Sequence, residues 1–426
     1  MPTAILIEAL IKVALLVGGL MTAAAYFVLL ERRIAAWTQD RVGPNRVGIP
    51  LTNIRLFGLG QPLADGVKMI LKEEYTPAHV DKRLYLLAPI IILTAALAIF
   101  AVIPFGSVVP TQGLGLEKLG LGDFKEPIEL VAAPGLDVGL IFVFALSSIA
   151  VYGVILGGWA SNSKYSFLGA LRSSAQLIAY ELPLGLALLG VVLTAGSLNL
   201  STIITQQAHS GVWFAFAQPL GFVVFVIAAF AEAARLPFDL PECEQELVGG
   251  YHTEYAGLKL LLFLVAEFLH MITASFLIVI LFLGGWHFWG LTGDTNEISL
   301  WGALIRIAVL SLKITGLIVF FMVVRWSWPR FRFDQLMTLA WKVMLPLGVV
   351  NLLATAIFQE VRFQIEPDSN SFTWNLVSVG FGMVVALAAW MVTAMLNPLV
   401  TDNRPVRDLV TEGIDPQVTL QATGAE

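Results

Sequence analysis

The feature that most constrains this chain is a series of nine apolar stretches, each about as long as a helix that crosses a bilayer. A hydrocarbon core takes about 20 apolar residues per helix. The stretches cover about residues 5–30, 84–107, 136–158, 174–196, 216–234, 258–284, 302–325, 340–360 and 372–396. They are continuous, whereas strands of a membrane barrel alternate over about ten residues. The sequence therefore predicts an all-α polytopic membrane protein with about nine transmembrane helices.

Composition agrees with this fold class, because 57% of the 426 residues are hydrophobic and 13% are charged. A soluble domain needs more charge to cover its surface. The first stretch has no basic segment before it and ends at Glu31, Arg32 and Arg33 instead of at a small-residue cleavage site. We therefore expect a retained helix and not a signal peptide.

The distribution of Lys and Arg predicts the orientation in the membrane, because basic loops stay in the cytoplasm. If Met1 lies outside, 19 basic residues fall in inner segments. Three fall in outer segments, namely Lys118, Lys125 and Arg362. Three more lie within the spans, namely Lys12, Arg306 and Lys313. The sequence thus predicts an outer N-terminus and a cytoplasmic C-terminus, and the net charge of −6 carries no indication of nucleic-acid binding.

An acidic loop, residues 231–257, follows the fifth stretch and begins AEAARLPFDLPECEQELVGGYHTEY. Glu242, Glu244 and Glu246 are separated by two residues each, so they lie close together in either an extended or a helical chain. Like charges at such spacing raise some pKa values and couple the titrations. Pro237 and Pro241 predict irregular backbone, which is tolerated near a membrane where it is buried or lines a wet cavity.

Three interpretations of the acidic loop stay open. It can be a solvated loop, a site for an oxygen-preferring metal made by Glu242, Glu244, Glu246 and His252, or a proton-handling site. We favour proton handling because apolar residues interrupt the acidic run and because Glu181 and Glu267 lie inside adjoining spans. Ionisable groups at membrane depth are functional candidates. Lys313, near the middle of the seventh stretch, is another candidate, with a structural ion pair as its alternative.

The sequence predicts two further features in the first inner loop, residues 31–83. From Gln61 to Glu74 apolar residues recur at helical spacing, which is typical of a helix lying in the membrane interface, although a solvated surface helix remains possible. Before it, Gly43 and Pro44 predict a turn that presents Arg41 and Arg46 near the membrane surface. These arginines can also serve only to anchor the loop to lipid or to a partner protein.

The sequence offers no group that carries electrons. It has one cysteine, Cys243, and five histidines, of which only His270 lies well inside a span. This set cannot build a four-thiolate iron–sulfur cluster or an intramembrane bis-histidine haem, and no nucleotide-binding glycine motif is present. We therefore expect no flavin, haem or iron–sulfur cluster in this chain, and any electrons must belong to a partner.

Five segments resemble, in order, those of the H-type membrane subunit of the proton-translocating NADH-quinone oxidoreductase, respiratory complex I, which is the family of mitochondrial NADH dehydrogenase subunit 1. They read ERRIAAWTQDRVGPNRVG, QPLADGVKMILKE, GWASNSKYSFLGALRSSAQLIAYE, AEAARLPFDLPECEQELVGGYHTEY and PRFRFDQLMTLAWKVMLPL. The resemblance implies an eight-helix core over residues 1–360, an additional transmembrane helix over 361–398 and a cytoplasmic tail over 399–426. It also implies location in a bacterial inner membrane.

The resemblance implies a role in forming part of the quinone chamber and in coupling quinone reduction to proton translocation. Implied quinone-binding residues are Glu31, Arg32, Trp37, Arg41, Arg46, Asp65, Lys68, Lys72, Arg235 and Phe238. Implied proton-path residues are Glu181, Glu232, Asp239, Glu242, Glu244, Glu246, Glu254 and Glu267, to which we add Lys313. Ser148 stands where some relatives have a glutamate, so that helix is not expected to contribute a carboxylate.

The resemblance further implies that the chain works only as a subunit of an oxidoreductase, without a complete active site of its own. Its substrate would be a quinone such as ubiquinone, bound jointly with peripheral subunits. Its partners would be iron–sulfur subunits, small membrane-arm subunits, antiporter-like subunits and lipids. Two alternatives stay open: the related membrane anchor of an energy-converting hydrogenase, and a stand-alone secondary transporter, for which inverted repeats would be expected.

Overall fold

In the part of the chain that the structure describes, every regular element is a helix, apart from one isolated β-bridge. The computed structural model describes residues 2–48, 57–110, 128–241, 244–293, 299–365 and 372–396. The long helices are α1 (Pro2–Thr38), α3 (Lys82–Ile99), α4 (Gly139–Ala160), α5 (Lys164–Ala195), α10 (Gly257–Phe282), α11 (Leu300–Ser327), α13 (Leu345–Ile365) and α14 (Phe372–Leu396). The shorter ones are α2 (Gln61–Leu71), α6 (Leu200–Ser210), α7 (Phe214–Ala217), α8 (Pro219–Glu232), α9 (Glu244–Leu247), η2 (Gly250–His252), α12 (Phe333–Thr338) and the π-helical η3 (Leu339–Met344).

The predicted fold class is confirmed, since eight helices among the described residues are long and apolar enough to cross a membrane. The fifth predicted span is shorter than expected, because α8 has 14 residues. Gln218 has a non-helical backbone and separates α7 from α8, and Pro219 has no N–H to continue a helix. At 1.5 Å per residue α8 is about 21 Å long, which is less than a hydrocarbon core of about 30 Å.

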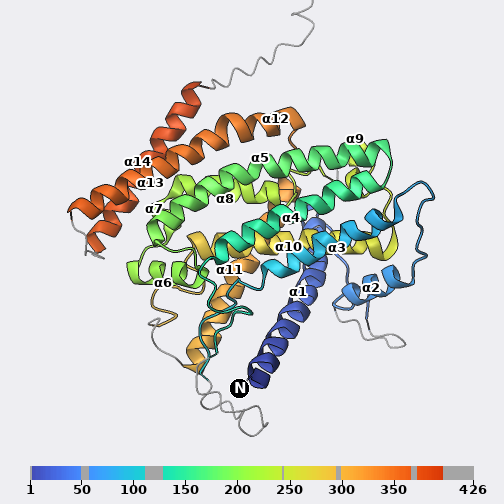
Figure 1. Ribbon diagram of the computed structural model, residues 1–426, viewed down its shortest axis with the longest axis horizontal. Coiled ribbons are helices and arrows are strands. Elements are labelled where there is room, and N and C mark those ends of the chain that lie inside the picture. Colours follow the sequence, from blue (N-terminus) through green and yellow to red (C-terminus); the bar gives the residue numbers. More distant parts are fainter. Residues whose placement is uncertain are drawn as a thin grey trace, which may run out of the picture. The chain divides into compact units, whose positions relative to one another are not determined.

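The core is built around α10, where 83% of the apolar window is buried. A helix that is apolar on all sides is expected to be enclosed by others. The helices α3, α4 and α5 follow one another side by side, and α10 packs against α3 (Figure 1). The first helix, α1, contacts α10 and α11. This arrangement brings the middle of α10 close to both the acidic loop and α1.

Close helix contacts in this core depend on glycine. A Cβ atom added at Gly169 of α5 would lie 2.6 Å from the backbone carbon of Gly250 and 2.7 Å from the backbone nitrogen of Tyr251. Real Cβ contacts do not approach so closely, and backbone atoms of η2 have no rotamer through which to move away. Gly169 therefore sets the distance between α5 and the acidic loop.

We expect Gly169→Val to displace the acidic loop and to lower the amount of correctly assembled protein by about tenfold, because overpacking a tight contact typically costs about 1–3 kcal/mol or more. The level of the chain in isolated membranes measures this effect. Gly185→Val is the matched control, since it lies in the same helix and a Cβ there would meet nothing within 4 Å. Equal levels of the two variants would contradict the prediction.

The amphipathic helix predicted from Gln61 is confirmed as α2, which ends at Leu71. None of its residues is buried, and its apolar side chains Leu63, Val67 and Ile70 are all exposed. An uncovered apolar face with charged residues elsewhere is typical of a helix that lies in an interface.

The predicted additional helix is confirmed as α14. Asn375 donates a hydrogen bond to the carbonyl of Ser210 at 2.8 Å, and Phe381 stacks on Phe358. Contacts divide the chain into two units after Ala386, and Leu387–Leu396 continue α14 as part of the second unit. The predicted cytoplasmic tail lies outside the described residues, so the division at residues 360 and 398 stays a prediction.

Candidate functional site

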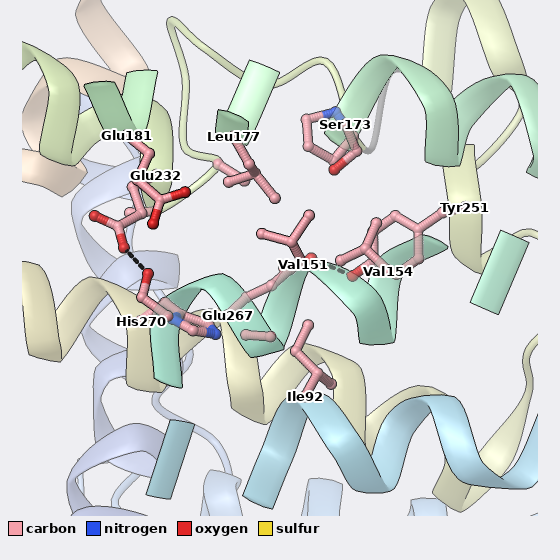
Figure 2. A pocket seen from close by; sticks show the side chains of 15 residues that line it. Ile92, Val151, Val154, Ser173, Leu177, Glu181, Glu232, Tyr251, Glu267 and His270 are labelled. Atoms are coloured by element: carbon pink, nitrogen blue, oxygen red, sulfur yellow. Dashed lines mark hydrogen bonds between the residues drawn. The ribbon is translucent and has the colours of Figure 1, made fainter. Parts of the chain in front are cut away.

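A cavity lined by carboxylates lies where α4, α5, α8, η2 and α10 meet. Its volume is about 50 Å³, enough for a few water molecules. Figure 2 shows Glu181 and Glu232 on the left, Tyr251 on the right and His270 below Glu232. We call this space the carboxylate cavity. Its polar and ionisable lining residues are Ser147, Ser173, Glu181, Glu232, Tyr251, Glu267 and His270.

Hydroxyl groups satisfy the carboxylates of this cavity. Ser147 and Ser148, neighbours on α4, donate to Glu232 and Glu181 respectively. Tyr251 donates to Glu267 at 3.1 Å. The helix α4 has no carboxylate in this cavity, but it supplies two hydrogen-bond donors to the carboxylates of other helices. Sequence reasoning did not single out Ser147 or Tyr251, although a Ser-Ser pair inside an apolar span is a signal that could have indicated them.

The first half of the acidic loop is held by polar side chains from other elements. The Gln176 amide donates to the carbonyls of Ala231 at 2.8 Å and Phe238 at 2.7 Å, so it joins the two ends of the turn. Arg330 donates to the carbonyl of Asp239. Phe238, implied to bind quinone, is buried and its ring lies near that of Tyr180. This part of the loop is therefore a fixed structure and not a solvated run of charges.

The second half of the acidic loop is fixed to α3 by two tyrosines. Tyr85 donates to the carbonyl of Glu254 at 2.7 Å, and Tyr255 donates to the carbonyl of Tyr85 at 3.1 Å. Their rings stack with centroids 4.1 Å apart. Burial, followed by the neighbouring Tyr85, raises the pKa of the Tyr255 hydroxyl above its ordinary value. The hydroxyl therefore stays protonated and remains a donor at physiological pH.

Not all of the predicted acidic residues face the carboxylate cavity. Glu246 forms an exposed ion pair with Arg172 of α5. Glu242 lies outside the described residues, as does the side chain of Glu244. Among the residues that are described, no group of three His, Cys, Asp or Glu side chains could hold a metal ion. The structure therefore offers no support for a metal site in the described part of the loop.

A second cavity, of about 450 Å³, lies between α1, α10, α11 and the acidic loop. We call it the arginine cavity, and its charged lining residues are Glu31, Arg32, Arg41, Arg235, Glu267 and Arg325. Glu31, which is 8% exposed, pairs with Arg325 and lies 3.8 Å from Arg235 Nη1. The Arg235 guanidinium lies 4.4 Å above the ring of Phe268. One buried carboxylate is thus shared by two guanidinium groups.

The remaining residues implied to bind quinone lie on α1, on or next to α2, and in the segment between these helices. Arg32 pairs with Asp65 at 2.6 Å, and Lys68 lies 3.9 Å from the same carboxylate, so Asp65 ties α2 to the end of α1. Trp37, at the end of α1, is exposed. Arg46 and Lys72 are exposed too.

Glu267 belongs to the lining of both cavities. It is 8% exposed and lies on α10, on the wall between the carboxylate cavity and the arginine cavity. Among the residues that line these two cavities, Glu267 is the one that they share.

Lys313 has partners of a different kind. Its ammonium group donates to the carbonyls of Leu283, Gly285 and His287 at 2.7 to 3.0 Å, and it lies 4.4 Å above the ring of Trp213. It thus satisfies carbonyls just after the end of α10, at the end predicted to face outward. Burial and then the charge of Lys313 lower the pKa of His287 below its ordinary value. Lys313 does not line the carboxylate cavity, and its assignment to the proton path stays a prediction.

Known proteins resemble most of this chain. The family model for NADH dehydrogenase matches residues 11–356. An H-type NADH-quinone oxidoreductase subunit from Geobacter metallireducens is 48% identical over 346 residues, which cover 81% of this chain and 94% of the relative. NADH-quinone oxidoreductase subunit 8 of Thermus thermophilus is 48% identical over 348 residues, covering 82% and 86%. The helix α14 lies beyond the family match.

Proposed function

The chain belongs to the NADH dehydrogenase family that includes the H-type subunits of NADH-quinone oxidoreductase, and from this premise we propose that it forms part of a quinone chamber and couples quinone reduction to proton translocation. It is a multi-pass membrane subunit of an oxidoreductase complex. The observation that carries the proposal is the position of Glu267, which borders both the arginine cavity and the carboxylate cavity.

The arginine cavity is the proposed site of contact with quinone. Arg235 is 6% exposed, and its Nε and Nη2 atoms have no hydrogen-bond partner among the described residues. A buried donor without a partner is costly, so a small rotation of the Arg235 side chain that brings these two atoms to the cavity would let water or a quinone oxygen accept from them. The ring of Phe268 and the exposed apolar face of α2 supply surfaces for the apolar parts of a quinone.

Proton transfer is the chemistry that this chain can contribute. Reduction of a quinone to a quinol takes two electrons and two protons. The electrons come from iron–sulfur subunits of the peripheral arm, and the carboxylates of this chain supply or replace protons. A change of charge in the arginine cavity alters the protonation of Glu267, and Glu232 and Glu181 then respond across the carboxylate cavity. Redistribution along this line starts translocation in the antiporter-like subunits.

The proposed function implies which subunits the chain contacts and how it lies in the membrane. Its partners are the peripheral quinone-module subunits, small membrane-arm subunits, antiporter-like subunits and membrane lipids. The N-terminus lies outside a bacterial inner membrane, and the acidic loop lies on the cytoplasmic side. The acidic residues Asp239, Glu242, Glu244, Glu246 and Glu254 form the cytoplasmic end of the proton path.

Arg235→Met tests the quinone contact in the purified complex. We expect the KM for quinone to rise about tenfold with a smaller change in kcat, because a hydrogen bond from a charged donor contributes about 1.5–3 kcal/mol. Glu31 keeps Arg325 as its partner in this variant. The control is Arg83→Met, an exposed residue in the first turn of α3 that lines neither cavity. An unchanged KM in Arg235→Met would refute the proposed contact.

A further inference from the structure

His270 is an ionisable residue of the carboxylate cavity to which the proposed function gives no role. It lies on α10 three residues after Glu267, so the two side chains share one face of the helix. It lines the same cavity as Glu181 and Glu232. No described residue forms a hydrogen bond with its ring, so its nitrogens are available to water in the cavity.

The carboxylates of the carboxylate cavity form hydrogen bonds with two different elements, η2 and α4. Glu267 accepts a hydrogen bond from the hydroxyl of Tyr251, whereas Glu232 and Glu181 accept hydrogen bonds from serine hydroxyls of α4. In Figure 2 the label of His270 lies below Glu232, on the side of the cavity opposite Tyr251. A proton that crosses from Glu267 to the other two carboxylates therefore passes through the space that His270 lines.

Imidazole has the chemistry that such a transfer needs. In its neutral form one ring nitrogen donates and the other accepts, so the ring can take a proton on one nitrogen and release another from the opposite side. Serine hydroxyls are less suited to hold the transferred proton, because a protonated alcohol is far more acidic than an imidazolium. The polar groups that line the cavity together with the ring are Glu267 on its own helix, Glu181 and Ser173 on α5, Glu232 on α8, Tyr251 on η2 and Ser147 on α4, while α3 contributes Ile92.

We propose that His270 relays protons between Glu267 and the pair Glu232 and Glu181, through water in the carboxylate cavity. A proton leaves the Glu267 carboxyl group and is taken by one ring nitrogen, and the proton on the other nitrogen passes to the Glu232 carboxylate. Rotation of the ring or return of a proton through water restores the starting tautomer. The proposal rests on the proposed function, because it places a second proton carrier on the same path.

The test uses the intact complex and measures NADH-driven quinone reduction and proton pumping in vesicles. We expect His270→Asn, which keeps a similar size but cannot carry a proton, to lower both by about tenfold and to show a larger solvent deuterium isotope effect than the wild type. We expect His270→Ala to be restored to at least about half of the wild-type rate by added imidazole, which can occupy the space that the side chain leaves. His209→Asn, at an exposed position of α6, is the matched control and should behave as the wild type.

The outcomes separate this proposal from the function on which it rests. Wild-type rates, pumping and isotope effect in His270→Asn, together with a defect in Glu267→Gln, would overturn the relay and leave the proposed function standing. Wild-type behaviour of Glu267→Gln would overturn the proposed function itself. A His270→Asn defect without a larger isotope effect and without imidazole rescue of His270→Ala would identify His270 as merely structural and also overturn the relay.

Discussion

Replacing Glu267 with Gln is expected to lower coupled quinone reduction and proton pumping by about tenfold or more in the intact complex. Gln keeps the shape of the side chain and can still accept the hydrogen bond from Tyr251, but it cannot bind or release a proton. Positioned acid–base groups typically contribute about a hundredfold or more to a rate. The expected decrease is smaller, at least about tenfold, because water that enters the two cavities would offer a slower route.

The measurements are the NADH-driven rate of quinone reduction and the number of protons pumped per electron in sealed vesicles. The control is Glu360→Gln, a glutamate near the far end of α13 that lines neither cavity. It should show wild-type rates and pumping. Full coupled activity in Glu267→Gln, with normal assembly of the complex, would show that the carboxylate bordering both cavities is not on the proton path.

The second large effect is expected for Glu31→Gln. The carboxylate of Glu31 neutralises Arg325 and Arg235, and all three side chains are at most 21% exposed. Removal of one partner from a buried ion pair typically costs about 3–5 kcal/mol, because an uncompensated charge stays buried. We therefore expect a strong decrease in the amount of assembled complex in membranes and a lower melting temperature of the purified complex.

Two further variants make this prediction specific. Glu246→Gln breaks an ion pair in which the carboxylate is 52% exposed, so its effect on stability should stay within about 1 kcal/mol. The double variant Glu31→Gln with Arg235→Met removes one of the two unpaired charges and should be more stable than Glu31→Gln alone. Equal melting temperatures for Glu31→Gln and Glu246→Gln would contradict the assigned role of the buried cluster.

Local sequence patterns predicted the helices well, because the length and polarity of a segment decide whether it can cross a bilayer. The exception is the segment of α7 and α8. The apolar stretch of residues 216–234 continues through Gln218, but the helix is interrupted at that residue. Glu267 and Glu181 were correctly placed within long helices, since their position in an apolar run is a property of the sequence itself.

The arrangement of partners around these residues could not be predicted in the same way. Ser147 and Glu232 are 85 residues apart in the chain, and Glu31 and Arg325 are 294 apart. Lys313 lies inside an apolar helix as expected, yet its partners are backbone carbonyls beyond the end of α10 and not a carboxylate. No periodicity within one segment specifies which other segment a side chain will meet.

The sequence by itself thus determined the all-α membrane fold and the position of Glu181 and Glu267 within long apolar helices, because hydrophobic length acts on each segment separately. The orientation in the membrane stays a prediction from the distribution of charge. Only the tertiary structure decided that Glu181, Glu232, Glu267 and His270 share one cavity and that Glu267 also borders a second. These features arise from the packing of α4, α5, α8 and α10, where contacts join residues far apart in the chain.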